Sequence, residues 1–447
     1  MVDSAIWVAH PAMVMLQPAR ILNGMTALDT FLPNLAAYTS HAPLVPVRIA
    51  TSPGCLHRFF DTSPISPSGR YLAALRMPDE SRLNTPGEAA EVVLVDLHSG
   101  DERVVAHTCG WEAQMGANIN WGADDHHLVF NDVDTSTWQS QLVVCDPLTG
   151  SSEKITGGVY HVSPDGRYAA ASCMEAMRRT QTGYGVMVPD DKVPLNRGAP
   201  DDDGMFITDL STGERTLAVS LADAAKVIPD LAGTDLERWH IHGFHCKWSG
   251  DGSRLIFTVR RWRSDGEKRR DFDNIGQDLR FDVLTCKPDG SELSDAVPAI
   301  CWKHGGHHIN WLPDGSGLSM NLGGFGDRLR FVRCDIDGSH LRPILLDSIG
   351  SGHPTVTPCG HILTDSYTRE QPFIHDDGTT PLRWVNIASG VEREAVRMTT
   401  VVAPGRHGAL RIDPHPAWDR SGTLVSFNAS ISGKRHVLIA NFSELLG

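Results

Sequence analysis

The sequence has no closely spaced cysteine pair, although it contains nine cysteines among its 447 residues. The cysteines lie singly along the chain, no CxxC motif occurs, and their number is odd. This pattern argues against a disulfide framework and a zinc ribbon, and it favours a reducing compartment. An excess of positive charge is also missing, because the formal net charge is −14. The chain has no overall electrostatic footprint for nucleic acid or an anionic membrane, and we expect neither as a partner.

Long apolar runs are missing as well. No stretch approaches the roughly 20 residues that a membrane helix needs. The N-terminal segment 1–24 has no early positive charge and carries His and Pro inside its apolar part. It is unlike a secretory signal, so we expect a cytoplasmic protein. The chain also lacks the G-x-S-x-G nucleophile elbow, which argues against a serine peptidase.

One short unit is present in seven copies. Each copy has an apolar strand end, often a Trp, then a four-residue turn that ends in Gly in all copies but the second, and then a second alternating strand. The copies begin at Ile65, Trp121, Val162, Trp248, Trp311, Val356 and Trp418. A further β-rich run with an Asp/Gly turn follows most copies, as in EVVLVDLHSG (91–100). Four short antiparallel strands per unit, repeated seven times, predict an all-β, seven-bladed β-propeller in which the Asp-Gly pairs form hairpin turns.

The repeats define the predicted domain organisation. We predict a single propeller over residues 46–447, preceded by an N-terminal extension, 1–45, that packs partly on it. The last blade needs a further strand, and the segment VPVRIAT (45–51) is the candidate for it. Such a strand closes the ring and removes an exposed sheet edge.

Two insertions interrupt the repeats. The first, at about 179–240, contains an Asp-, Gly- and Pro-rich run and a predicted helix at 221–233. The second, at about 260–278, is strongly basic. It is either a solvated surface loop or a rim loop that attracts an acidic ligand.

A column of similar residues lies three positions before the Trp or its substitute. Copies four to seven have a histidine there and the second copy has an asparagine: His245, His308, His353, His415 and Asn118. Because the innermost strands of a propeller surround one axis, we expect these residues to converge on a shared central mouth. Neutral imidazoles at these positions suit Zn, Mn or Fe ions. Alternatively, some of the histidines act as general bases, or bind a carboxylate in their charged form. The position in the column does not separate these roles.

Further histidines lie close to this column. His242 lies three residues before His245, and His307 directly precedes His308. Because side chains alternate along a strand, we expect His307 to point away from His308 or to reach the rim.

The third copy differs from the others. Tyr160 stands two residues before Val162, and Arg178 and Arg179 lie past the end of the second strand, near the expected rim. A Tyr near an Arg in a histidine-lined mouth can do acid/base work on a substrate whose charge the Arg neutralises. Alternatively, one of the two arginines pairs with an acidic neighbour.

These features resemble the seven-bladed propeller polysaccharide lyases of the oligogalacturonate lyase and short ulvan lyase type. The resemblance lies in the HxxW-x-x-DG inner hairpins and in the segments 159–186 and 350–367, and it spans most of the chain after about residue 50. Lyases of this group cleave uronic-acid-containing glycans by β-elimination. A metal ion or Arg neutralises the carboxylate, a His or Tyr removes the proton at C5, and an unsaturated sugar remains.

The resemblance implies roles for the candidate residues. It implies a divalent metal ion, Mn or Zn, bound by His245, His308 and His353. It implies catalytic roles for Tyr160, Arg178, Arg179 and His242, and substrate contacts for Asn118, His307 and His415, the last also a possible fourth metal ligand. The expected ligand is a uronate-containing oligosaccharide, short and imported, since no secretion signal is found. The alternative is a non-catalytic propeller that acts as a scaffold or binding protein.

Overall fold

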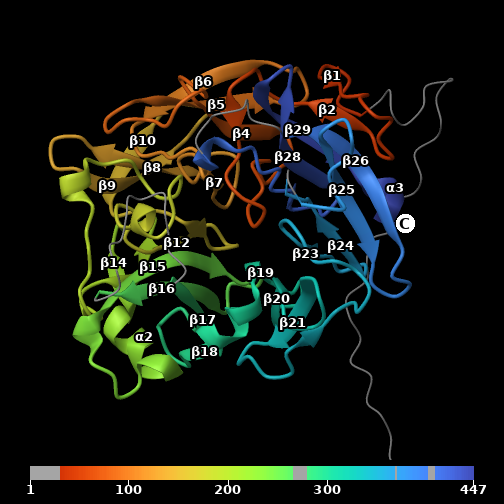
Figure 1. Cartoon of the computed structure of the whole chain (residues 1–447). Coiled ribbons are helices and arrows are strands. Elements are labelled where there is room, and N and C mark those ends of the chain that lie inside the picture. Colours follow the sequence, from red (N-terminus) through yellow and green to blue (C-terminus); the bar gives the residue numbers. More distant parts are fainter. Residues whose placement is uncertain (1–30, 265–278, 368–369, 401–407, 447) are drawn as a thin grey trace, which may run out of the picture.

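The computed structural model describes residues 31–264, 279–367, 370–400 and 408–446. Within these ranges the strands form antiparallel sheets that stand in a ring around one axis, and the chain visits the sheets in sequence order (Figure 1). The fold is therefore a β-propeller, as the repeats predict. No helix in the described part of the chain is long and apolar enough to cross a membrane.

Five sheets have four strands each. They consist of β3 (Cys55–Leu56), β4 (Tyr71–Arg76), β5 (Ala90–Asp96) and β6 (Glu102–Thr108); β7 (Asn120–Trp121), β8 (Leu128–Asp134), β9 (Gln139–Cys145) and β10 (Ser152–Thr156); β11 (His161–Val162), β12 (Tyr168–Ala171), β13 (Gly204–Asp209) and β14 (Arg215–Ser220); β15 (Trp239–Trp248), β16 (Leu255–Arg263), β17 (Arg280–Cys286) and β18 (Ser294–Val297); and β19 (Gly306–Trp311), β20 (Gly317–Leu322), β21 (Arg330–Asp335) and β22 (Arg342–Pro343). In four of these sheets the first strand, β7, β11, β15 or β19, carries one copy of the predicted turn at its end, whereas in the sheet that begins with β3 the turn follows an isolated bridge between Ile65 and Leu72.

The last two repeats belong to a nine-stranded sheet. It contains β23 (Thr355–Val356), β24 (His361–Thr364), β25 (Thr379–Asn386) and β26 (Glu392–Thr399), and then β27 (Ala417–Trp418), β28 (Leu424–Ile431), β29 (Lys434–Asn441), β2 (Val47–Ile49) and β1 (Ala36–Ala37). A single residue pair, Thr399 with Ser430, joins the two groups. The count of seven blades therefore stays a prediction.

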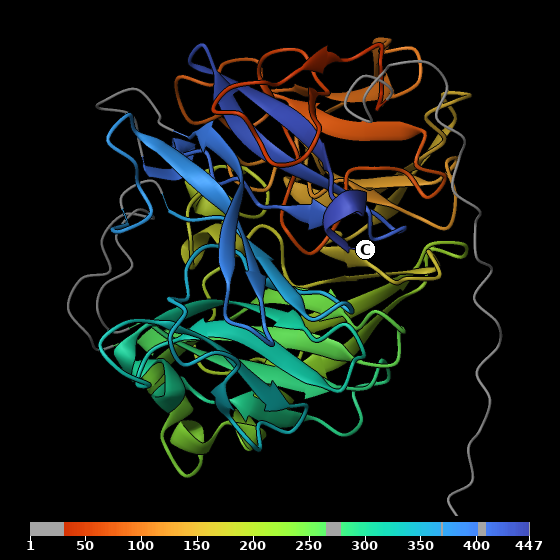
Figure 2. The ribbon, with the colours of Figure 1, turned by 90° about the vertical axis from the view of Figure 1, so that its right-hand side faces the viewer.

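Strand β2 closes the ring. It pairs antiparallel with β29, Val47 opposite Ala440, and the blue C-terminal strands lie beside the red-orange N-terminal segment in both views (Figures 1 and 2). This is the pairing predicted for residues 45–51, and it confirms that the N-terminal region completes the last sheet.

The repeated turn holds neighbouring sheets together. The carboxylate of Asp314 accepts a hydrogen bond from the backbone N–H of Ser316 at 3.0 Å, which confirms the turn role of the Asp-Gly pairs. The indole N–H of Trp311 donates to the carbonyl of Lys247 in the preceding sheet at 3.0 Å. Trp121 donates in the same way to the carbonyl of Pro64 at 2.8 Å. The Trp of the unit thus joins one inner strand to the next.

The described insertions add short helices. The predicted helix at 221–233 is confirmed in its first half as α2 (Leu221–Val227), whose N-cap Ser220 accepts a hydrogen bond from the backbone of Asp223. Pro229 then begins a 3₁₀ turn, Pro229–Leu231, because a proline cannot continue the α-helical hydrogen bonds. Other 3₁₀ turns are Met177–Arg179, Asp190–Lys192, Leu236–Arg238, Ala299–His304 and Gly408–Leu410, and α3 (Ser443–Leu446) lies near the C-terminus.

The basic insertion at 260–278 lies only partly within the described residues. Residues 260–263 extend β16, where the Arg261 side chain is fully buried and bonded to Asp282 at 2.8 Å. Residues 265–278 lie outside the described ranges.

Candidate functional site

A short stretch of chain, residues 57–61, lies on the propeller axis; we call it the axial segment. Its buried Phe59 ring is surrounded by imidazoles, with centroid distances of 5.5 Å to His245, 5.9 Å to His308, 5.3 Å to His353 and 4.7 Å to His415. One phenyl ring therefore contacts a histidine from each of four sheet units. The four residues that share one sequence column do converge, and we call them the histidine cluster.

The backbone explains how the cluster faces the axis. His308 and His415 have positive φ angles of 62° and 49°, and Asn118 in the same column has 50°. A left-handed residue costs energy for any side chain larger than glycine, and it interrupts the pleat of the strand. The pairing of β19 with β20 shifts register between His307 and Asn310, an interval that contains His308.

The expectation that His307 points away from His308 is wrong. The two ring centroids lie 4.4 Å apart, and their Nδ1 atoms are 2.9 Å apart. The left-handed backbone of His308 removes the alternation on which that expectation rested. Burial lowers the pKa of His307 to about 3, so it joins the cluster as a neutral ring.

Three residues of the mouth have the spacing of metal ligands. One ligand atom each from His353, Asp413 and His415 lies within 4.8 Å of the others, and all three side chains are buried. Asp413 was not among the sequence candidates, although it stands only two residues before His415. His308 stacks on His353 with a centroid distance of 3.7 Å, but it is not part of this group.

A buried carboxylate orients two of these residues. Asp365 accepts hydrogen bonds from the backbone N–H of His353 at 2.6 Å and from that of His415 at 3.2 Å. The imidazole Nδ1 of His353 lies 2.9 Å from Asp365 Oδ2, the oxygen that also accepts from His415. A proton on Nδ1 leaves the Nε2 lone pair free, which is the arrangement found around metal-bound histidines.

The donor atoms fit a divalent cation. Nε2 of His353 and both ring nitrogens of His415 have no hydrogen-bond partner in the described part of the chain. Burial lowers the pKa of His415 well below its ordinary value, so its ring is neutral near pH 7. Arg411 bonds the Asp413 carboxylate at 2.8 Å. Two imidazoles and one carboxylate are a ligand set typical of manganese, iron or zinc.

His245 stands apart from the three ligands. Its ring stacks on Tyr160 at 4.9 Å and on Phe244 at 3.9 Å, and its Nε2 has no partner among the residues described. Burial lowers the pKa of His245 well below its ordinary value. A neutral, half-buried imidazole with a free nitrogen can accept a proton.

His308 is held on both sides of its ring. Its Nδ1 lies 2.5 Å from the carbonyl of Gly352, and its Nε2 lies 3.2 Å from the hydroxyl of Tyr367. Burial raises the pKa of Tyr367 well above its ordinary value, so this phenol keeps its proton. The sequence column does not include Tyr367, which follows β24.

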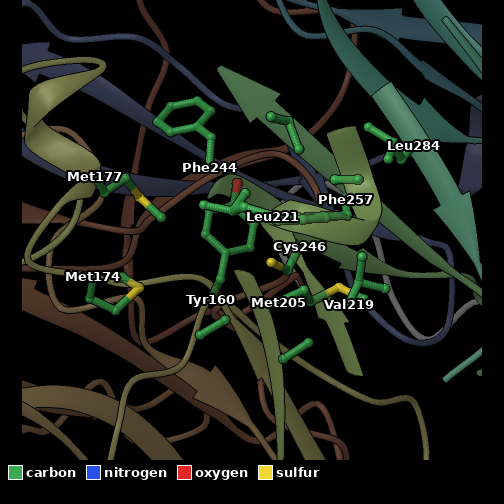
Figure 3. Close-up of a cluster of buried hydrophobic side chains, with 14 of the residues drawn as sticks. Tyr160, Met174, Met177, Met205, Val219, Leu221, Phe244, Cys246, Phe257 and Leu284 are labelled. Atoms are coloured by element: carbon green, nitrogen blue, oxygen red, sulfur yellow. The ribbon is translucent and has the colours of Figure 1, made fainter. Parts of the chain in front are cut away.

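The remaining sequence candidates are not members of the ligand group. Tyr160 is fully buried among hydrophobic side chains that include Met174 and Phe244 (Figure 3), and burial raises its pKa well above the ordinary value. Asn118 is also fully buried. His242 stacks on Trp262 with a centroid distance of 5.2 Å. Their assigned roles stay predictions.

The two predicted arginines have partners outside the mouth. Arg178 donates to the carbonyl of Val188 at 2.9 Å and lies 3.5 Å from the Asp190 carboxylate, and Arg179 donates to the carbonyl of Val193 at 2.7 Å. The acidic pairing considered for one of them is thus present in Arg178.

Other cations border the cluster instead. Arg411 is half-buried beside Asp413, and Arg260 is half-buried with its guanidinium 3.6 Å above the Phe244 ring. The Arg260 side chain also donates to the Gln181 side chain at 2.8 Å. Neither arginine occupies a repeated position, so alignment of the repeats does not reveal them.

Two solved structures share this fold over almost the whole chain. An oligogalacturonate lyase in complex with manganese aligns with a TM-score of 0.58 and 15% sequence identity, covering 92% of this chain and 97% of that one. An oligogalacturonate lyase from Vibrio parahaemolyticus aligns with a TM-score of 0.59 and 13% identity, covering 93% and 98%. No protein-family model and no curated protein sequence matches the chain. At these identities the likeness establishes the fold. The two structures belong to the group of lyases that the sequence resembles.

Proposed function

We propose that this protein is a lyase that cleaves uronate-containing oligosaccharides by β-elimination at the histidine cluster. The observation that carries the proposal is the ligand group His353, Asp413 and His415 at the axis of a propeller. It is supported by the fold shared with two oligogalacturonate lyases, one of them in complex with manganese. The chemistry needs a cation and a base on either side of one sugar ring, and this mouth offers both.

The metal that we propose is manganese. A carboxylate in the ligand set, in place of a third imidazole, favours a harder ion than Zn²⁺. When bound, the ion supplies positive charge that neutralises the uronate carboxylate and so acidifies the neighbouring C5 proton. Of the ligands predicted from the sequence, His353 is retained, and Asp413 and His415 replace His245 and His308 in this proposal.

Arg411 binds the same carboxylate from the side of the protein. Its guanidinium contacts Asp413 and is half-buried, so a carboxylate that reaches the ligand group also meets a fixed cation. An interaction between opposite charges is strengthened where water is largely excluded. Arg411 therefore takes the role predicted for Arg178 and Arg179.

His245 is the base of the proposed reaction. Its free Nε2 takes the proton from C5, the electrons of that bond form the C4–C5 double bond, and the bond from C4 to the bridging oxygen breaks. The leaving oxygen takes the proton of Tyr367, whose hydroxyl is positioned by His308. Exchange of protons with solvent then restores both residues. Tyr160 holds the His245 ring from behind by stacking.

The substrate that we propose is a short oligosaccharide handled in the cytoplasm. All nine cysteines are free thiols, which suits a reducing compartment.

The test is an absorbance assay with manganese supplied. The wild-type protein is incubated with oligogalacturonates and with other uronate oligosaccharides, and the near-ultraviolet absorbance of the new double bond is followed. We expect His245→Gln to retain manganese binding and to lose at least about 100-fold in kcat, the lower range for general base catalysis. We expect Asp413→Asn to lose manganese binding and activity together. His126→Gln is the matched control, because His126 is exposed and pairs with Asp146 away from the mouth.

Two results contradict the proposal. One is a wild-type protein that binds manganese in calorimetry yet gives no absorbance change on any uronate oligosaccharide. The other is a His245→Gln variant as active as His126→Gln. A protein that binds no divalent metal supports the scaffold alternative instead.

A further inference from the structure

Arg260 is a cation beside the histidine cluster that the proposed reaction does not use. It belongs to β16 and is half-buried. Its guanidinium lies 3.6 Å from the centroid of the Phe244 ring, and the His245 ring stacks on Phe244 at 3.9 Å. Because two groups cannot share one face of a ring at these distances, Arg260 and His245 cover opposite faces. One phenyl ring therefore separates this guanidinium from the proposed base.

No negative charge compensates Arg260. Among the residues described, no carboxylate pairs with it, and the groups that act on it electrostatically are the phenols of Tyr184 and Tyr160. Burial lowers its pKa to about 10, so it still carries its charge at pH 7. Charges removed from water normally have a partner of opposite sign. Three other arginines with buried side chains show that arrangement, each with a carboxylate: Arg58 with Asp61, Arg261 with Asp282 and Arg383 with Glu392.

One end of the Arg260 guanidinium is free to bind a ligand. Its Nη1 donates to the carbonyl of Thr180 at 3.2 Å and to the side chain of Gln181 at 2.8 Å, and its Nε is buried. Its Nη2 has no hydrogen-bond partner in the described part of the chain, yet it is not among the buried unpaired atoms. Nη2 is therefore accessible, and the protein holds the guanidinium in place through Nη1.

Arg260 and Arg411 both lie close to Tyr184. Both guanidiniums act electrostatically on the Tyr184 hydroxyl, and the Tyr184 ring lies 6.0 Å from the ring of His245. Arg411 contacts Asp413 of the ligand group, whereas Arg260 lies on the side of the base. A ligand that extends from the ligand group to His245 therefore has a guanidinium near each end.

We propose that Arg260 binds the carboxylate of a second uronate unit, next to the unit whose carboxylate meets Arg411. This assignment rests on the proposed function for the kind of ligand, a uronate oligosaccharide, and does not depend on catalysis. A guanidinium and a carboxylate form a strong, charge-assisted hydrogen bond. The preferred ligand then has two adjacent uronates, because an oligosaccharide that alternates uronates with neutral sugars leaves Arg260 without a counter-charge. Arg260 determines specificity and takes no part in the proton transfers.

Two disaccharides of similar size separate one anionic group from two. Digalacturonate carries a carboxylate on both units, and galacturonosyl-rhamnose carries a single one. Each is titrated by calorimetry into the His245→Gln protein with manganese supplied, because we expect this variant to bind the sugar without cleaving it. We expect digalacturonate to bind at least about 10-fold more tightly, since a hydrogen bond between charged groups contributes about 10- to 100-fold in affinity.

Two further variants in the same protein assign the difference to one residue. We expect Arg260→Met to weaken digalacturonate binding by about 10-fold or more and to leave galacturonosyl-rhamnose within about twofold, because the single carboxylate goes to the ligand group. Arg215→Met is the matched control and should change neither affinity. The Arg215 guanidinium lies 3.4 Å from the centroid of the Phe206 ring, but on the outer strand β14. Circular dichroism and Tm report whether each variant is folded, and the preference of the protein that retains Arg260 needs neither of them.

Three results overturn the role of Arg260. One is equal affinity for the two disaccharides, or no binding of digalacturonate, when Arg260 is present. Another is a folded Arg260→Met variant that keeps the preference for digalacturonate. The third is an equal loss of affinity for both disaccharides, which makes Arg260 a support for the shape of the site only.

The proposed function is tested separately, by the absorbance assay on protein that carries His245. Digalacturonate binding that depends on Arg260, without cleavage of any uronate oligosaccharide, removes the lyase and leaves the Arg260 site. Cleavage of digalacturonate that is unchanged in Arg260→Met removes the site and leaves the lyase.

Discussion

Asp61 on the axial segment is the residue whose loss we expect to cost the protein most stability. Its carboxylate lies 3.0 Å from Arg58 and 3.0 Å from Lys247, and all three side chains are about 2% exposed. Lys247 also donates to the carbonyl of Ile309 at 2.8 Å. The substitution Asp61→Asn keeps the shape of the side chain and leaves two buried cations without a counter-charge.

The magnitude follows from this burial. Removing one partner of a buried ion pair costs about 3–5 kcal/mol, because the remaining charge stays desolvated. We therefore expect Asp61→Asn to lower the free energy of unfolding by about that amount. Lys247→Met in the same chain removes one of the two unpaired cations, so the double variant should be more stable than Asp61→Asn alone, with a coupling of about 1–3 kcal/mol between the two sites.

The assay is guanidinium unfolding at pH 7, followed by tryptophan fluorescence and by circular dichroism. Glu237→Gln is the control, because Glu237 pairs with Arg197 at 3.2 Å with both side chains mainly exposed, and such pairs contribute little. The reasoning is refuted if Asp61→Asn is as stable as Glu237→Gln. It is also refuted if the double variant is less stable than the sum of the two single changes predicts.

Three further predictions concern pH, the proposed ligand group and thiol reactivity. Burial alone would raise the pKa of Asp61, but the charges of Arg58 and Lys247 hold this pKa below its usual range. The stabilisation that ionised Asp61 gives the folded protein is therefore complete above the unfolded pKa of about 4 and is lost as the pH falls below it. The Tm difference between wild type and Asp61→Asn should accordingly shrink from pH 6 to pH 3. Asp365→Asn should weaken manganese binding by about 10- to 100-fold in calorimetry without unfolding the protein, because it orients His353. Under native conditions Cys359 should react first with a thiol reagent, as one rapid equivalent in an absorbance assay, because it alone among the nine cysteines is exposed.

The fold could be predicted because its unit is repeated. One copy of the turn says little, but the copies at Trp248, Trp311 and Trp418 recur in the innermost strands of the sheets, and the offset of three residues then places a histidine at an equivalent position in each unit. This offset works because the position of each innermost segment relative to the axis is fixed by the ring. The convergence of His308 with its neighbours follows from topology without any knowledge of distances.

What the repeats could not predict lies between them or breaks their regularity. Phe59 and Arg260 occupy positions with no equivalent in the other copies, so no column shows them. Asp413 precedes its histidine by two residues, but a D-x-H signal is common and gains meaning only when His353 is known to lie opposite. His307 was misplaced because alternation assumes an ordinary strand, whereas the left-handed φ of His308 brings both rings together.

The axial segment determines how the two ends of the propeller can influence each other. Phe59 contacts the histidine cluster, and Asp61 lines a cavity of about 750 Å³ beside the repeated tryptophans, so the two ends are two residues apart along the chain. Lys247 lies within 5.0 Å of the Phe59 ring and bonds Asp61, which fixes both residues to one inner strand. A change at one end can therefore reach the other only by moving this segment, and the buried ion pairs of Asp61 with Arg58 and Lys247 oppose such a movement. We expect a change at the tryptophan end to leave the histidine cluster unaltered.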